Sequence, residues 1–277
     1  MIARVIIAVV IVLVAATSYP GAVAVSMAVR LTPPPVTGPS ATPSGQLPWL
    51  HVEHRQGIAP YISDDQGRLV LLHGAIPASL LDFGKDRGSP PSSPPVYPID
   101  PAAYTGSCPE ASAGSRYPPL CRSDLTQMAA LGFNSLRLPL SWSLLEPSRD
   151  QFNDVYVARV VQVVDWARSL GMYVIIDMHQ NAFSPYLPPG SGVNLASHSG
   201  APAWATLTDG LPSTVLLKDQ REANPAVFEA FTNFWYNRNG IQDAYIAAIG
   251  FLAKRFKDDS AVIGYSIFLY RVAPEGM

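Results

Sequence analysis

Apolar residues in this chain gather in short runs that are separated by longer stretches with helical spacing. The runs at 69–72, 133–140, 172–177 and 261–268 each have the length of a buried strand. A turn at Asp64-Asp65-Gln66-Gly67 precedes the first run. Strands that alternate with helices along a chain predict an α/β fold built on a parallel sheet.

The stretches between these runs predict helices. Ser123 is the expected N-cap of a helix over 124–131, and Asn153 or Asp154 is the expected N-cap of the next one. Further helices are expected to begin at Asn224-Pro225 and to cover 241–256. In the second helix these apolar residues share one face: Tyr156, Val160, Val163, Val164, Ala167 and Leu170.

Polar side chains stand at the carboxyl end of the third predicted strand. These are Asp177, His179, Gln180 and Asn181. Strand alternation turns Asp177 and His179 to one face, and α/β barrels keep their chemistry at this end of the strands. Donors and acceptors grouped in this way suit a polyhydroxylated ligand. The alternative is structural: an Asp that binds nearby backbone and a His that is a satisfied core residue.

Arg137 interrupts the apolar second strand. A buried guanidinium requires a carboxylate partner, because an unpaired buried charge is strongly destabilising. Arg137 therefore either belongs to a functional site or closes a layer of the sheet by pairing with Asp177. Spacing alone does not separate these two interpretations.

Two side chains just beyond this strand are further candidates. The indole face of Trp142 could stack on a sugar ring, although a core tryptophan is an equally good interpretation. Glu146 lies several residues past the strand end, and we therefore do not assign it to catalysis. We expect Glu146 to help start the following helix instead.

The composition fits a large globular domain. Hydrophobic residues make up 48% of the 277 residues and charged residues only 14%, which is enough for a sizeable core. The formal net charge is -2 and no long basic run is present, which argues against nucleic acid as a partner.

The N-terminus has the pattern of an export signal. Arg4 precedes an apolar run over 5–16, and the small-residue pattern Ala22-Val23-Ala24 follows. We interpret residues 1–24 as a signal peptide, because the run is shorter than the about 20 residues that span a bilayer; an uncleaved membrane anchor is the alternative. Residues 25–49 are then a Pro/Ser/Thr-rich linker. We expect the protein to be secreted, extracellular or in the cell envelope.

Export gives the two cysteines a role. Cys108 and Cys121 lie in a loop rich in Gly, Pro and Ser, and an oxidising compartment favours one disulfide between them. A metal site is not expected, because the spacing does not fit one and no histidine pair is near. His51 and His54, close to the linker, are interpreted as incidental.

Several motifs run through the predicted elements: Gly132-Phe133-Asn134, Leu136-Arg137-Leu138-Pro139, Trp142, Glu146-Pro147, Asp177-Met178-His179-Gln180-Asn181 and Phe234-Trp235-Tyr236-Asn237. Together they resemble glycoside hydrolase family 5, the cellulase family, over about residues 67–268. The last two motifs are most similar to the endoglycoceramidase branch of that family.

The resemblance implies a (β/α)8 TIM barrel that hydrolyses O-glycosyl bonds of β-glycans or glycolipids by a retaining mechanism. The family uses two glutamates, an acid/base in an Asn-Glu-Pro motif after strand four and a nucleophile at the end of strand seven. Arg137 matches the arginine that keeps the nucleophile ionised, and His179 matches a histidine of the sugar subsite. The other expected binding and supporting residues are Trp142, Asp177, Gln180 and Asn181. No cofactor is implied, since two carboxylates suffice for this chemistry.

The sequence departs from the family pattern after residue 268. Tyr270 stands at the acid/base position, and Glu275 lies too far along the chain to replace it. Only about the first four β/α units of the barrel are expected within residues 50–277, without the strand that carries the nucleophile. We therefore expect a truncated or frameshifted product that diverges at about Leu269, with unpaired strand edges and with Arg137 lacking its carboxylate partner.

These observations predict a secreted protein of a glycosidase family that is inactive in this truncated form. One alternative is a non-catalytic protein that binds glycans or glycolipids, and another is a half-barrel that a separate C-terminal half-barrel completes. The expected partner is a carbohydrate or glycolipid substrate. Membrane contact is expected only through an uncleaved N-terminal anchor.

Overall fold

The structure is a computed structural model that describes residues 45–81, 97–110, 118–188, 199–214, 216 and 222–268. The predicted signal peptide, most of the linker, Tyr270 and Glu275 lie outside the described residues. The elements in chain order are β1 (Leu50–Glu53), β2 (Tyr61–Asp64), β3 (Gly74–Ala75), η1 (Pro101–Tyr104), α1 (Arg122–Ala130), β4 (Ser135–Leu140), α2 (Trp142–Leu145), α3 (Asp154–Ser169), β5 (Tyr173–Met178), η3 (Ala203–Ala205), α4 (Pro225–Trp235), η4 (Arg238–Gly240), α5 (Ile241–Phe256) and β6 (Val262–Ser266).

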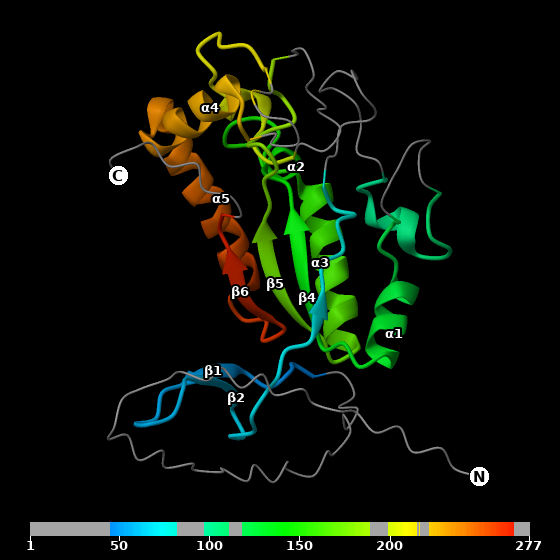
Figure 1. Cartoon of the computed structure of the whole chain (residues 1–277). Coiled ribbons are helices and arrows are strands. Elements are labelled where there is room, and N and C mark those ends of the chain that lie inside the picture. The colour runs from blue at the N-terminus through cyan, green and yellow to red at the C-terminus, as the bar shows by residue number, and fades with distance from the viewer. Residues whose placement is uncertain are drawn as a thin grey trace, which may run out of the picture. The chain divides into compact units, whose positions relative to one another are not determined.

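A parallel sheet in the order β3-β4-β5-β6 forms the centre of the described chain (Figure 1). β4 and β5 pair along their whole length, from Ser135 opposite Tyr173 to Leu140 opposite Met178. Helix α3 packs along β5, and α1 lies against α3. The prediction of a parallel α/β sheet is confirmed, and the second, third and fourth predicted strands are β4, β5 and β6.

Alternation gives the sheet two different faces. One face of β4 and β5 is fully or almost fully buried, through Leu136, Leu138, Leu140, Val174, Ile176 and Met178. The predicted apolar face of α3 packs in the same core, where its residues from Tyr156 to Ala167 are 0% exposed. The opposite face of the sheet carries Arg137, Asp177 and Ser266, which contact one another. The sheet therefore separates an apolar core from a polar face.

The predicted starts of the long helices are confirmed, except at α1. The side chain of Asn153 accepts a hydrogen bond from the amide of Tyr156 at the start of α3, and Asn224 accepts from Ala226 at the start of α4. Gly171, with φ of 75°, follows α3 in the left-handed conformation that favours glycine. No helix in the described part of the chain has both the length and the apolar character to cross a membrane.

The position of the first predicted strand is wrong. Residues 69–72 do not join the parallel sheet: Leu69 forms an antiparallel bridge to Ser63, and Leu71 is 82% exposed. Pairing with β4 begins only at Gly74, where an added Cβ would lie 2.5 Å from the backbone oxygen of Ser135. At this point β3 and β4 approach so closely that only glycine fits.

An antiparallel hairpin of β1 and β2, which the sequence pattern did not predict, precedes the sheet. Its residues are mostly half-buried or exposed, so they lack the clear alternation of a strand with one buried face. The hydroxyl of Tyr173 donates to the carbonyl of Pro48 at 2.9 Å, and the amide of Ser260 donates to Gln46 Oε1 at 2.8 Å. These contacts attach the segment before β1 to the first residue of β5 and to the residues before β6.

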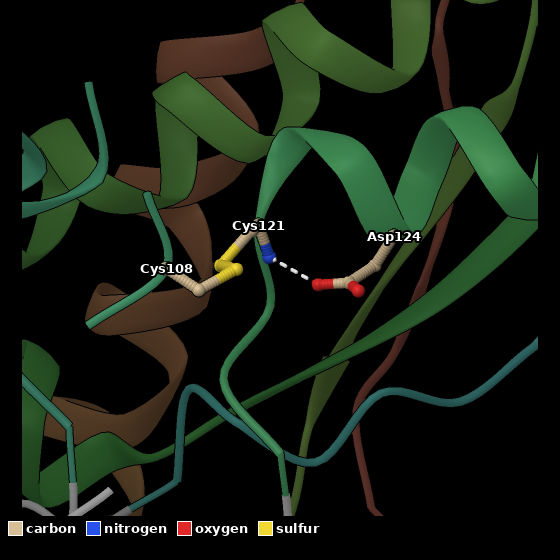
Figure 2. A group of neighbouring side chains, drawn as sticks. All are labelled: Cys108, Cys121 and Asp124. Carbon is tan, nitrogen blue, oxygen red and sulfur yellow. Dashed lines mark hydrogen bonds between the residues drawn. A yellow bond between two sulfur atoms is a disulfide. The ribbon is translucent and has the colours of Figure 1, made fainter. Parts of the chain in front are cut away.

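The N-cap of α1 also differs from the prediction. The cap is Cys121 rather than Ser123, because the amide of Cys121 donates to the Asp124 carboxylate at 2.7 Å (Figure 2). Cys121 is bonded to Cys108 with a Cα–Cα distance of 5.8 Å, so the predicted disulfide is present. The three side chains lie close enough to form a metal-binding group. Here, however, the sulfurs form a crosslink and the carboxylate caps a helix.

The disulfide should stabilise the fold by joining the segment around η1 to the start of α1. Cys108→Ser is expected to lower the free energy of unfolding by about 3 kcal/mol, the value that loop-closure entropy gives for a short loop. Guanidinium denaturation monitored by circular dichroism measures this change. The unmodified protein under reducing conditions is the control and should match the variant. An unchanged denaturation midpoint in both would contradict a stabilising crosslink.

Candidate active site

A single buried carboxylate, that of Asp177, connects the carboxyl ends of β4, β5 and β6. Its side chain is 0% exposed, and Arg137 Nη2 donates to its Oδ1 at 3.1 Å. The same Nη2 donates to Ser266 Oγ at 3.2 Å. His179 Nδ1 lies 3.0 Å from the other oxygen, Oδ2. The cluster therefore brings together side chains from all three strands or their ends.

The surroundings of Asp177 keep it ionised. Burial on its own would raise the pKa of Asp177, because it disfavours the charged form. The hydrogen bonds and charges of His179 and Arg137 outweigh burial, so the pKa is lowered from its ordinary value. An ionised carboxylate only accepts hydrogen bonds, so Nδ1 of His179 carries a hydrogen. Nε2 of that ring then remains for a ligand, since it makes no hydrogen bond within the described residues.

The expectation that Arg137 lacks a carboxylate partner is wrong, because Asp177 supplies one. The pairing that a structural arginine would make is therefore present. Arg137 can also make further hydrogen bonds. Its side chain is 30% exposed, and its buried Nε has no acceptor among the described residues. A role for Arg137 in a functional site stays a prediction, and this unused donor is compatible with it.

Gln180 and Asn181 continue the chain from the end of β5 but make different contacts. Gln180 Nε2 donates to the hydroxyl of Tyr245 on α5 at 3.1 Å, and that hydroxyl donates to the carbonyl of Ile267 after β6. Burial raises the pKa of Tyr245, and the charge of Asp177 adds to this effect, so the phenol stays protonated. Asn181 instead pairs through its backbone with Ser199. The Gln180–Tyr245 link fixes the ends of β5 and β6 relative to each other.

An aromatic-lined cavity, with room for roughly one water molecule, adjoins this polar cluster and shares His179 with it. Its lining residues are Trp142, Met178, His179, Gln180, Phe183, Ala201, Phe234, Tyr245 and Phe268. No sequence pattern pointed to Tyr245, because it falls on the apolar face of a helix like many core tyrosines. Ser266 could have been found, since it lies near the carboxyl end of the strand predicted at 261–268; the structure places it opposite Asp177.

Trp142 and Glu146 form a buried pair. Trp142 is 3% exposed, and its indole N–H donates to Glu146 Oε2 at 2.8 Å. The other carboxylate oxygen of Glu146 accepts from the amide of Asp150 at 2.8 Å. We expected Glu146 to help start α3, and this prediction is wrong. Glu146 instead stabilises the turn that follows α2. The core interpretation of Trp142 is supported by this burial, while stacking on a sugar stays a prediction because the ring also lines the cavity.

Residues 107–268 match the sequence pattern of the family "Cellulase (glycosyl hydrolase family 5)". The chain belongs to this family. Its parallel sheet is accordingly part of the (β/α)8 barrel fold of glycosyl hydrolase family 5.

Similar proteins within the family carry endoglycoceramidase names. Endoglycoceramidase I of Rhodococcus hoagii (strain 103S) is 27% identical over 76% of this chain and 36% of its own length. A crystal structure of endogalactoceramidase is 35% identical, with a TM-score of 0.62, over 80% of this chain and 44% of that one. The structure of endo-glycoceramidase II from Rhodococcus sp. in a ganglioside GM3 complex is 30% identical, with a TM-score of 0.56. The match covers 75% of this chain and 42% of that one. The chain thus spans less than half the length of each.

The Asp177 carboxylate should stabilise the fold in a pH-dependent way. Asp177→Asn is expected to lower the free energy of unfolding by about 3 kcal/mol at neutral pH, because it leaves Arg137 unpaired. The pKa of Asp177 is lower in the folded state than in the unfolded state. Asp177 therefore stabilises the fold fully at pH values above its unfolded-state pKa. That stabilisation is lost as the pH falls through the folded pKa. Urea unfolding from neutral to acidic pH measures both effects.

The matched control for this variant is Asp165→Asn, which removes a half-exposed partner of Arg168 on α3. We expect this control to change stability by less than about 1 kcal/mol. If Asp177→Asn were no less stable than the control at neutral pH, the Asp177 cluster would not be a stabilising element.

Proposed function

We propose that the carboxyl end of β4, β5 and β6 is the sugar-binding part of a glycoside hydrolase active site that takes β-linked glycans or glycolipids. The observation that carries this proposal is the Asp177–His179 pair beside an aromatic cavity, which leaves Nε2 of His179 without a hydrogen bond among the described residues. Hydroxyl groups need both donors and acceptors, and aromatic rings suit the apolar faces of sugars. The endoglycoceramidase names of the similar proteins support a glycolipid as one substrate class.

We further propose that this chain binds sugar without hydrolysing glycosides on its own, and that it is secreted. Tyr270 stands where the family has its acid/base glutamate. A phenol has an ordinary pKa of about 10 and is a poor general acid near neutral pH. Secretion is supported by the pattern of residues 1–24 together with the disulfide.

A half-barrel completed by a second polypeptide is the other candidate. Within the described residues, β3 and β6 each have a strand neighbour on one side only. Such edges can accept a further strand from another chain. A separately supplied C-terminal half-barrel would then bring the nucleophile at the end of strand seven.

Calorimetry and a fluorogenic β-glycoside assay on the purified chain distinguish these proposals. We expect lactose or cellobiose to bind with no measurable turnover, and His179→Ala to weaken binding at least tenfold. His54→Ala, which removes an exposed histidine of the hairpin region, is the matched control and should bind like the unmodified chain.

Turnover by the chain alone would contradict the proposed inactivity, and absence of any sugar binding would contradict the proposed site. Turnover that appears only after addition of a polypeptide carrying the later strands of the barrel would favour the half-barrel.

A further inference from the structure

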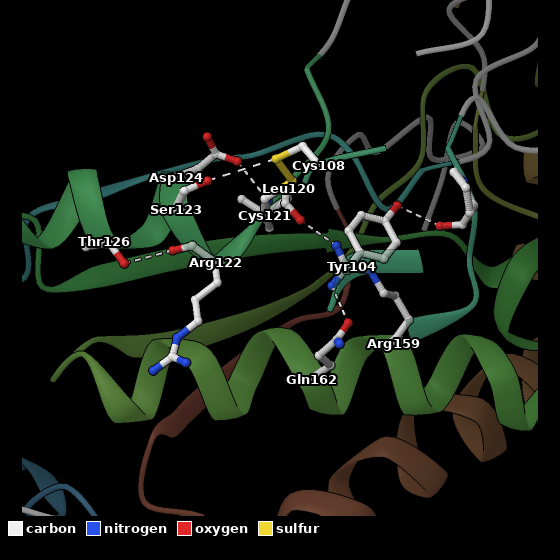
Figure 3. The surroundings of a disulfide bond; sticks show 11 residues. Tyr104, Cys108, Leu120, Cys121, Arg122, Ser123, Asp124, Thr126, Arg159 and Gln162 are labelled. Atoms are coloured by element: carbon white, nitrogen blue, oxygen red, sulfur yellow. Dashed lines mark hydrogen bonds between the residues drawn. A yellow bond between two sulfur atoms is a disulfide. The ribbon is translucent and has the colours of Figure 1, made fainter. Parts of the chain in front are cut away.

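Arg159 on α3 is a buried cation with neutral partners. It is 2% exposed, its Nη1 donates to Gln162 Oε1 at 2.9 Å, and its Nη2 donates to the carbonyl of Leu120 (Figure 3). The guanidinium carbon lies 3.5 Å from the ring centroid of Tyr104 and 5.1 Å from that of Trp166. The guanidinium group has more N–H donors than these two acceptors satisfy.

The charge of Arg159 has no counter-charge in the described part of the chain. Arg137 and Arg168 each pair with an aspartate, whereas no described carboxylate forms an ion pair with Arg159. Burial lowers the pKa of Arg159, but an arginine keeps its proton in proteins. A buried charge without a partner is strongly unfavourable, and aromatic rings offset only part of that cost. No carboxylate of the described residues therefore offsets this charge.

A second cavity lies beside this guanidinium and shares no residue with the aromatic cavity near His179. Besides Arg159, its polar lining includes Ser79, Tyr97, Tyr104 and Tyr156. The Oγ of Ser79 is buried and has no hydrogen-bond partner among the described residues. The cavity has room for roughly one water molecule, so any occupant must be small.

We propose that this cavity binds one small monovalent anion, such as chloride, as the counter-ion of Arg159. A water molecule would fit the space but would leave the charge uncompensated. A phosphate or an organic carboxylate would be too large. The anion would accept hydrogen bonds from the guanidinium and from the Ser79 hydroxyl, and would thereby stabilise the packing of Leu80, η1 and α3 around Arg159.

The first test compares melting temperatures in sodium chloride and in sodium gluconate at equal ionic strength. A ligand that binds only the folded state stabilises it, and we expect chloride to raise the melting temperature by about 2–4 °C. Ser79→Ala should reduce this difference while leaving the protein folded, and Arg159→Gln should abolish it. Arg168→Gln, which removes another arginine of α3 that pairs with exposed or half-buried aspartates, should retain the full difference.

The second test locates the anion directly. Crystals of the unmodified chain grown in sodium bromide are expected to show an anomalous peak next to the guanidinium of Arg159 and Ser79 Oγ. Equal melting temperatures in both salts would overturn the proposal. So would the absence of a halide peak, with a water molecule or a carboxylate of the chain in its place.

Discussion

The carboxylate of Asp177 sets the strongest constraint on this structure. A charged group that is completely buried must be paired, and the partners of Asp177 come from different strands or their ends. In the sheet, Asp177 lies opposite Pro139 of β4 and opposite Ser266 of β6. This register places the guanidinium of Arg137 within hydrogen-bond distance of Asp177 and of Ser266. Strand register and the polar face of the sheet therefore depend on the same contacts.

A second set of contacts surrounds this cluster and orders its outer edge. The hydroxyl of Tyr245 links Gln180 after β5 to the carbonyl of Ile267 after β6, while its ring contacts Trp142, Phe234 and Phe268. The contact of Nδ1 with Asp177 Oδ2 orients the ring of His179, which lines the same cavity as these aromatic side chains. Such preorganisation is what a sugar subsite requires, because few side chains then need to be ordered on binding.

The sequence predicted the elements whose residues show clear periodicity. Helices α3 and α5 and strands β4 and β5 follow from apolar spacing, and the side chains of Asn153 and Asn224 cap helices as their positions suggest. The cluster of Asp177 and His179 could also be expected, since alternation alone places both on one face.

Other features depend on contacts between residues that are far apart in the sequence. Leu69 bridges to Ser63 of the hairpin instead of joining the parallel sheet, and the link through Tyr245 requires the packing of α5 near the sheet ends. Local periodicity carries no information on these distant pairings. Glu146, by contrast, was misinterpreted for a local reason: the helix α2 that brings it to Trp142 is too short to show a periodic pattern.

We propose that His179 and the end of β5 form a sugar subsite. Titration of the isotope-labelled chain with lactose, followed through the histidine ring resonances by NMR, tests whether His179 contacts the sugar. We predict that the ring signals of His179 shift with saturation while those of the exposed His51 and His54 stay unchanged. Equal small shifts of all histidines, or no shift of His179 at any lactose concentration, would contradict the assignment of this site.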